Sequence, residues 1–168
     1  MKVEITKGTD RDWIEIFRDQ NSTEKTSFPK KGTIPHDAVH FIVETKLELR
    51  NGFWGMIADG VRAADIQDIA KKAGHASAAR ARLPDANIVE LLQAERLVEC
   101  FEADIWSGSD DVELFQDIAR AACESSFVPD MQISADTILA IRSQLNKFEA
   151  RWTGAPIGHT VTFEWRGN

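Results

Sequence analysis

The chain has 168 residues, which is enough for one domain with a sizeable hydrophobic core. Its formal net charge of -7 argues against broad binding to nucleic acids or anionic membranes. No apolar run approaches the ~20 residues of a membrane span, and the first residues lack the apolar core of a signal peptide, so we expect a cytoplasmic protein without a membrane partner.

Residues 2–28 predict a β-meander of two or three strands. Val3 and Ile5 alternate with polar residues, which is the period of a half-buried strand. A second β-rich run covers residues 13–17, and a polar run at residues 23–28 is typical of an edge strand. Turn-forming residues separate the runs.

Helical spacing dominates the middle of the chain. The first helix is expected to begin around Pro35, with Thr33 as its cap, and to end before Asn51-Gly52. Four further stretches have an apolar stripe with helical spacing: residues 61–73, 85–106, 112–128 and 134–153. Residues 53–58 are bulky and apolar, which fits a short buried helix or a turn.

Residues 160–165 alternate apolar and polar side chains, as a strand does. A lone strand is not stable in water, so we expect it to join the N-terminal meander. The sequence therefore predicts one α+β domain over residues 1–168. In it, a small, mostly antiparallel sheet built from both chain ends packs against four or five helices.

Residues with catalytic or metal-binding potential gather between positions 34 and 44. His36 and His40 are four residues apart, Asp37 follows the first, and Glu44 lies four residues after the second. At ~100° per residue of α-helix, these side chains share one edge of the helix. Two imidazoles and a carboxylate on a rigid helix are suitable ligands for a divalent metal such as zinc.

Two interpretations of this cluster remain open. In the first, His36, His40 and Glu44 bind the metal, and Asp37 is a base that helps a metal-bound water to attack an ester, amide or phosphate. A further ligand would then come from elsewhere in the chain, from His75 or His159. In the second, the same side chains form a hydrogen-bonded network that holds the helix on the sheet, and no metal binds.

The cluster carries two resemblances. His36-Asp37-x-x-His40 resembles the His-Glu-x-x-His signature of metalloproteases, which implies two zinc ligands and a general base, with the shorter Asp37 at the position of the glutamate. A wider pattern resembles a group of small, functionally unassigned bacterial proteins. That pattern consists of Pro35-His36-Asp37, His40, Val43-Glu44, Gly52-Phe53-Trp54-Gly55, Trp152, Gly158 and Trp165. This resemblance implies a single compact cytoplasmic domain.

A basic segment at residues 71–82 is a second candidate site. Lys71, Lys72, Arg80 and Arg82 supply four fixed positive charges without an intervening carboxylate. Such a segment would bind a phosphate, a nucleic-acid backbone or an acidic partner, or would be a solvated loop that offsets nearby acids. No aromatic residue interleaves with these charges, which argues against binding of single-stranded nucleic acid.

Other catalytic signatures are missing from the sequence. There is no nucleophile elbow and no phosphate-binding glycine loop. Cys100 and Cys123 lie in predicted helices and lack a metal-type spacing, as expected of reduced thiols in a core. We therefore expect a small cytosolic protein that binds a protein or small-molecule partner, with a divalent-metal-dependent hydrolase as the alternative.

Overall fold

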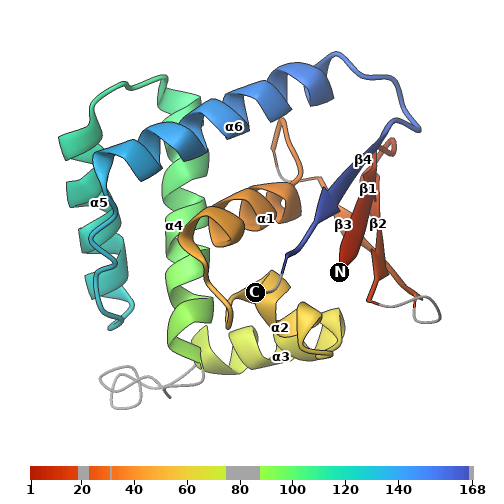
Figure 1. Cartoon of the computed structure of the whole chain (residues 1–168), viewed down its shortest axis with the longest axis horizontal. Coiled ribbons are helices and arrows are strands. Elements are labelled where there is room, and N and C mark those ends of the chain that lie inside the picture. Colours follow the sequence, from red (N-terminus) through yellow and green to blue (C-terminus); the bar gives the residue numbers. More distant parts are fainter. Residues whose placement is uncertain (19–22, 31, 75–87, 167–168) are drawn as a thin grey trace.

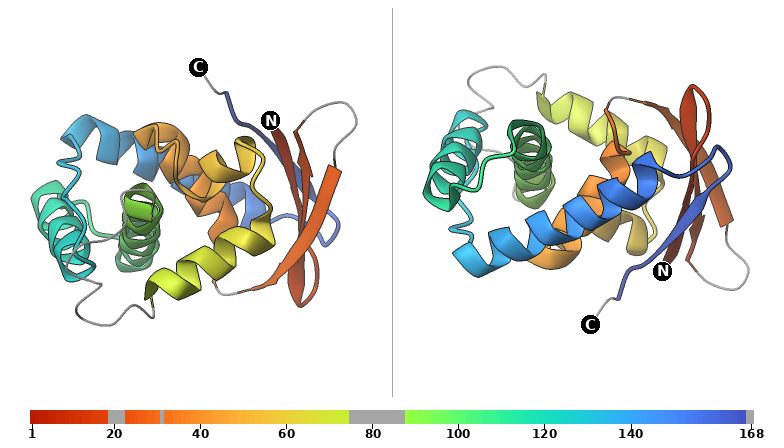
Figure 2. Two further views of the ribbon diagram at one scale, coloured as in Figure 1. Left: turned by 90° about the horizontal axis from the view of Figure 1, so that it is seen from below. Right: turned by 90° about the horizontal axis from the view of Figure 1, so that it is seen from above.

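A four-stranded antiparallel sheet forms one side of the molecule, and helices cover its inner face (Figure 1, Figure 2). The structure, a computed structural model, describes residues 1–18, 23–30, 32–74 and 88–166. The strands have the order β3-β2-β1-β4. Their bounds are β1 Lys2–Thr6, β2 Arg11–Phe17, β3 Thr23–Pro29 and β4 Thr160–Glu164. The last strand pairs with the first, so both chain ends meet in one sheet.

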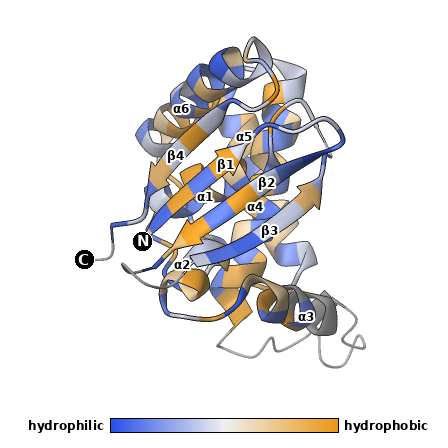
Figure 3. Cartoon of the chain, turned by 90° about the vertical axis from the view of Figure 1, so that its right-hand side faces the viewer, coloured by the Kyte–Doolittle hydropathy of each residue, from blue (hydrophilic) through white to orange (hydrophobic). Residues whose placement is uncertain are grey.

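The inner face of the sheet is apolar at its centre. Val3 is paired with Ile16 on one side and with Phe163 on the other. Paired residues share a face, and the four isoleucine and valine side chains at the centre of β1 and β2 are at most 1% exposed: Val3, Ile5, Ile14 and Ile16. Polar residues alternate with them along β1, whereas the outer face of β2 carries Trp13 and Phe17 as well as Arg11 and Glu15 (Figure 3). The period-2 pattern of the sequence therefore places one face against the helices.

Six helices are described. Their bounds are α1 His36–Leu47, α2 Phe53–Ala58, α3 Ala63–Gly74, α4 Val89–Ser107, α5 Val112–Ser125 and α6 Ala135–Thr153. In Figure 1, α1 passes between α4 and the sheet, with α6 across it. Seven successive residues of α1, 38–44, are buried, because neighbours cover this helix on several sides.

The predicted α+β architecture is confirmed, including the pairing of the C-terminal strand with the meander. The prediction of four or five helices is low because residues 53–58, left open as helix or turn, form the short helix α2. Among the described residues, no helix has both the length and the apolar character needed to cross a bilayer.

Helix starts were predicted with mixed success. Ser134 caps α6 as expected, since its side chain accepts a hydrogen bond from the Thr137 N–H. The expected cap at Thr33 is wrong: Pro35 is the N-cap of α1, and the Thr33 hydroxyl donates to Glu149 instead. The described part of the long helix α4 begins at Val89; the start predicted at Asp85 lies within residues 75–87, outside the described part of the chain.

Candidate metal centre

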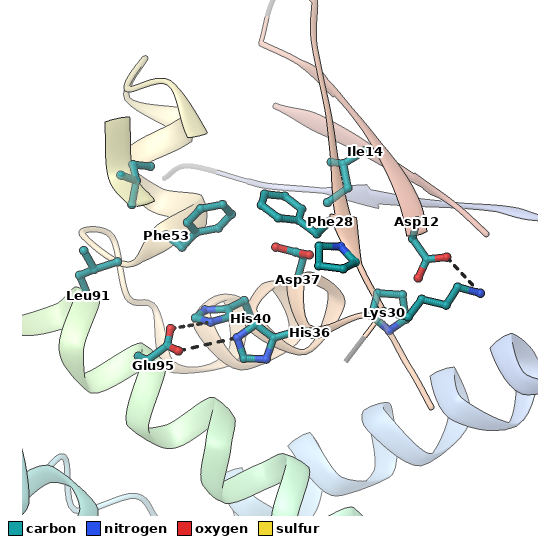
Figure 4. Close-up of a pocket in the computed structure, with 13 residues that line it drawn as sticks. Asp12, Ile14, Phe28, Lys30, His36, Asp37, His40, Phe53, Leu91 and Glu95 are labelled. Atoms are coloured by element: carbon teal, nitrogen blue, oxygen red, sulfur yellow. Dashed lines mark ion pairs between the residues drawn. The ribbon is translucent and has the colours of Figure 1, made fainter. Parts of the chain in front are cut away.

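His36 and His40 lie one turn apart on α1, on the side that faces α4 (Figure 4). Their rings meet edge to face, with centroids 4.7 Å apart. His40 is buried, whereas 21% of the His36 side chain is exposed. The helical spacing therefore brings both imidazoles to one place, and His36 lies nearer the solvent.

The two ring nitrogens of His40 face two different carboxylates. Nδ1 lies 2.9 Å from Oε1 of Glu44, and Nε2 lies 3.3 Å from Oε2 of Glu95 on α4. Burial by itself lowers the pKa of His40, but the hydrogen bonds with Glu44 and Glu95 outweigh burial and raise the pKa to about 10. The same contact with His40 lowers the pKa of Glu95 to about 2, against the opposing effect of partial burial.

His36 repeats this arrangement with a different glutamate. Its Nδ1 lies 2.9 Å from Oε1 of Glu102, which is seven residues after Glu95 on α4. Its Nε2 lies 3.9 Å from Oε1 of Glu95. Each imidazole therefore has a carboxylate of its own at Nδ1, and both Nε2 atoms face the carboxylate of Glu95 (Figure 4).

His36, His40 and Glu95 form a group whose potential ligand atoms all lie within 4.8 Å of one another. Donor atoms around tetrahedral zinc lie about 3.4 Å apart, given bonds of about 2.0–2.2 Å. A small closing movement of these side chains would therefore bring the three donor atoms to the spacing of a metal site. The glutamates at Nδ1 would fix the ring orientation, as carboxylates do behind the histidine ligands of known metal sites.

The carboxylate of Glu44 accepts hydrogen bonds from the start of α2. Its Oε1 accepts a hydrogen bond from the N–H of Phe53 at 3.1 Å, and its Oε2 accepts one from the N–H of Trp54 at 2.8 Å. Gly52 permits this approach, because a Cβ at that position would lie 2.5 Å from Oε2 of Glu44. The Gly52-Phe53-Trp54 segment and Glu44 therefore form one structural unit that positions His40.

A pocket of about 400 Å³ adjoins the three-residue group. Asp37 lines it, as do Asp12 and Lys30, whose side chains form an ion pair of 3.6 Å at the end away from the histidines (Figure 4). The walls between are mainly apolar and come from five elements: Ile14, Phe28, Phe53, Ile66 and Leu91. The candidate metal group is thus exposed to a space large enough for a small molecule.

The structure arranges the predicted residues in a way the sequence did not anticipate. Glu44, expected as a metal ligand, contacts the ring nitrogen of His40 that faces away from the three-residue group. Glu95 and Glu102 were not identified from the sequence. Their only local signal is a spacing of seven residues, which puts both on one face of α4.

Several predicted residues lie outside this group or outside the described residues. His159 contacts the ring of Trp152 rather than the two histidines of α1. His75, Arg80 and Arg82 lie outside the described residues, and for Lys71 and Lys72 only the helical backbone is described. The role of the basic segment 71–82 therefore stays a prediction.

Both cysteines are buried and free, as the sequence predicted. Burial raises the pKa of Cys100, and burial with the nearby negative charge of Asp130 raises the pKa of Cys123 to about 11. Neither thiol is therefore suited to nucleophilic chemistry near neutral pH.

Comparisons of the chain with protein-family models, with curated proteins and with solved structures found no match. The functional argument therefore depends on the geometry of His36, His40 and Glu95 and of the pocket beside them.

Proposed function

We propose that this protein binds a divalent metal ion of the zinc class through His36, His40 and Glu95 and presents it to a small molecule in the adjoining pocket. One observation carries the proposal: both Nε2 atoms face Glu95 while both Nδ1 atoms are held by other carboxylates. Two imidazoles with one carboxylate are a ligand set used for catalytic zinc, with a further position left for water or substrate.

The charge of the cluster supports a cation. Three carboxylates, those of Glu44, Glu95 and Glu102, surround two imidazoles, so the cluster is negative even when both rings are protonated. In the alternative account, His40 is an imidazolium between Glu44 and Glu95, and the group is only a link between α1 and α4. Both accounts are based on the same contacts, so a measurement of metal binding is needed to distinguish them.

The test is zinc titration of metal-free protein purified without an affinity tag. We expect about one high-affinity zinc ion per chain, and a loss of affinity of about tenfold or more in Glu95→Gln and in His36→Ala/His40→Ala. Glu99→Gln is the matched control, because Glu99 lies one turn further along α4 and is paired with Arg96 instead. Equal zinc affinity in all four proteins would overturn the proposal.

Metal-dependent hydrolysis is a second candidate function, and the position of Asp37 in the same pocket favours it. Zinc lowers the pKa of a bound water to about 7. The water oxygen would then form a bond to the acyl carbon of an ester or amide, with Asp37 accepting the proton and returning it to the leaving oxygen or nitrogen. Asp37→Asn should keep the zinc and lose hydrolysis in a screen of small esters and amides.

A further inference from the structure

We infer that the pocket takes a small molecule of two parts, an oxygen-donor group that binds the metal and an uncharged, apolar body. This inference rests on the proposed metal site and adds the chemical class of its ligand. It follows from the walls of the pocket and from the way its charged groups are paired.

The walls beyond the histidines are suited to an apolar body. Phe28 comes from the edge strand β3 and Phe53 from α2, and their rings lie on the side of the pocket opposite α4 (Figure 4). Leu91, from α4, is on the same side of the pocket as Glu95. A ligand attached to the metal between His40 and Glu95 would therefore extend along aromatic and aliphatic side chains, and its burial there would be favourable.

The charges that line the pocket disfavour an anionic body. Three carboxylates are present, those of Asp12, Asp37 and Glu95. Lys30 supplies the only ammonium group of the described lining, and it is already engaged: Nζ donates to the Gly8 carbonyl at 2.7 Å and lies 3.6 Å from Asp12. The rings of His36 and His40, which also line the pocket, already face Glu102, Glu44 and Glu95. Within the described lining, a negative group on the body would therefore find no cation that lacks a carboxylate partner.

Hydroxamates provide probes that share one zinc-binding group and differ only in the body. For the zinc-loaded protein, we expect benzohydroxamate to bind about tenfold more tightly than acetohydroxamate, because the phenyl ring is buried in the pocket. 4-Carboxybenzohydroxamate should lose that advantage, because its carboxylate would face Asp12 and Asp37. Both comparisons use calorimetric or competition titrations at one pH.

Substitutions in the pocket walls test whether the preference for benzohydroxamate depends on the aromatic side chains there. With each variant saturated with zinc, Phe28→Ala and Phe53→Ala should each reduce the preference for benzohydroxamate over acetohydroxamate by about threefold or more. Trp13→Ala is the matched control, because this aromatic residue is 54% exposed and does not line the pocket. Two substitutions are used so that a folding defect in one of them does not decide the result.

The outcomes separate the two proposals. A protein that binds zinc but takes acetohydroxamate and benzohydroxamate equally well would overturn the ligand class and leave the metal site intact. A preference that Phe28→Ala and Phe53→Ala both leave unchanged would also overturn it. A protein that binds no zinc would overturn the metal site and the ligand class together.

Discussion

The Nδ1 atom of His40 lies 2.9 Å from Oε1 of Glu44, and both side chains are buried on the same helix. The carboxylate of Glu44 also accepts hydrogen bonds from the N–H groups of Phe53 and Trp54. One glutamate thus joins α1, the start of α2 and a candidate metal ligand. Changes at this position should therefore affect the stability of the fold and the properties of the site together.

We expect Glu44→Gln to lower the free energy of unfolding by about 1–3 kcal/mol, because the amide NH2 would face one of the three N–H groups that now donate to the carboxylate. Zinc affinity should fall by about 10–100-fold, since the ring of His40 loses its charged partner. Urea unfolding and zinc titration measure the two effects. Glu48→Gln is the control, because Glu48 is exposed just after α1. Wild-type values for Glu44→Gln would contradict the assigned role.

Gly52→Ala tests the same unit from the other side. The new methyl group would lie 2.5 Å from Oε2 of Glu44, and the carboxylate cannot yield easily because three N–H groups hold it. We expect a loss of about 1–3 kcal/mol in the free energy of unfolding from this overpacking. At Gly154 the nearest atom to an added Cβ is the Ala150 oxygen at 3.8 Å, so Gly154→Ala should have little effect. Equal unfolding midpoints for the two variants would count against the contact.

The fold was predictable because its signals are local. Alternation in Val3 and Ile5 identifies a strand, and the capping Ser134 identifies the start of a helix. The pairing of residues 160–165 with the meander followed from one physical requirement, that a strand needs a partner. The start of α1 was predicted to within one residue, but its cap was missed, because Pro35 takes the cap position without a side-chain hydrogen bond, whereas Thr33 offered a more familiar capping group.

The site was predictable only in the part that lies within one helix. The i, i+4 spacing brings His36 and His40 together, but the third member of the group comes from α4. The packing of α1 on α4 is a tertiary contact, which residue spacing in the sequence does not show. Spacing alone also placed Glu44 beside His40 without showing which ring nitrogen it would contact. Hydrogen bonds from the backbone N–H groups of residues 53 and 54 determine the position of the Glu44 carboxylate, and the pattern of side chains in the sequence does not indicate these hydrogen bonds.

Stability of the metal-free protein should depend on pH through His40. The folded pKa of about 10 lies above the ordinary value of 6.5, so the stabilising contribution is complete below about pH 6.5 and is lost as pH rises toward 10. Urea unfolding in the presence of a chelator, from pH 6.5 to 10, measures this effect. His40→Gln should show a smaller decline over the same range, and parallel curves for the two proteins would contradict the prediction.

The contact between His40 and Glu95 also predicts that stability falls at acidic pH. The folded pKa of Glu95, about 2, lies below the ordinary 4.5, so its contribution is complete above about pH 4.5 and is lost as pH falls toward 2. Unfolding of wild type and Glu95→Gln at pH 5 and pH 3 measures it. The variant should lose less stability than wild type between these two values. An equal loss in both proteins would show that Glu95 is not stabilised by His40.

The C-terminal strand should be essential for cooperative folding. Phe163 pairs with Val3 in the sheet, and its ring lies 4.9 Å from that of Phe41 and 5.7 Å from that of Phe148, measured between centroids. Phe163→Ala should lower the free energy of unfolding by about 2–3 kcal/mol, less than for a fully buried phenylalanine because the side chain is half-buried. Thr162→Ala, on the exposed face of the same strand, should change it by less than about 0.5 kcal/mol. Deletion of residues 157–168 removes the whole strand and uncovers one edge of β1, so we expect a broad, non-cooperative thermal transition. A sharp transition in the truncated protein would show that β1, β2 and β3 suffice to hold the helices in place.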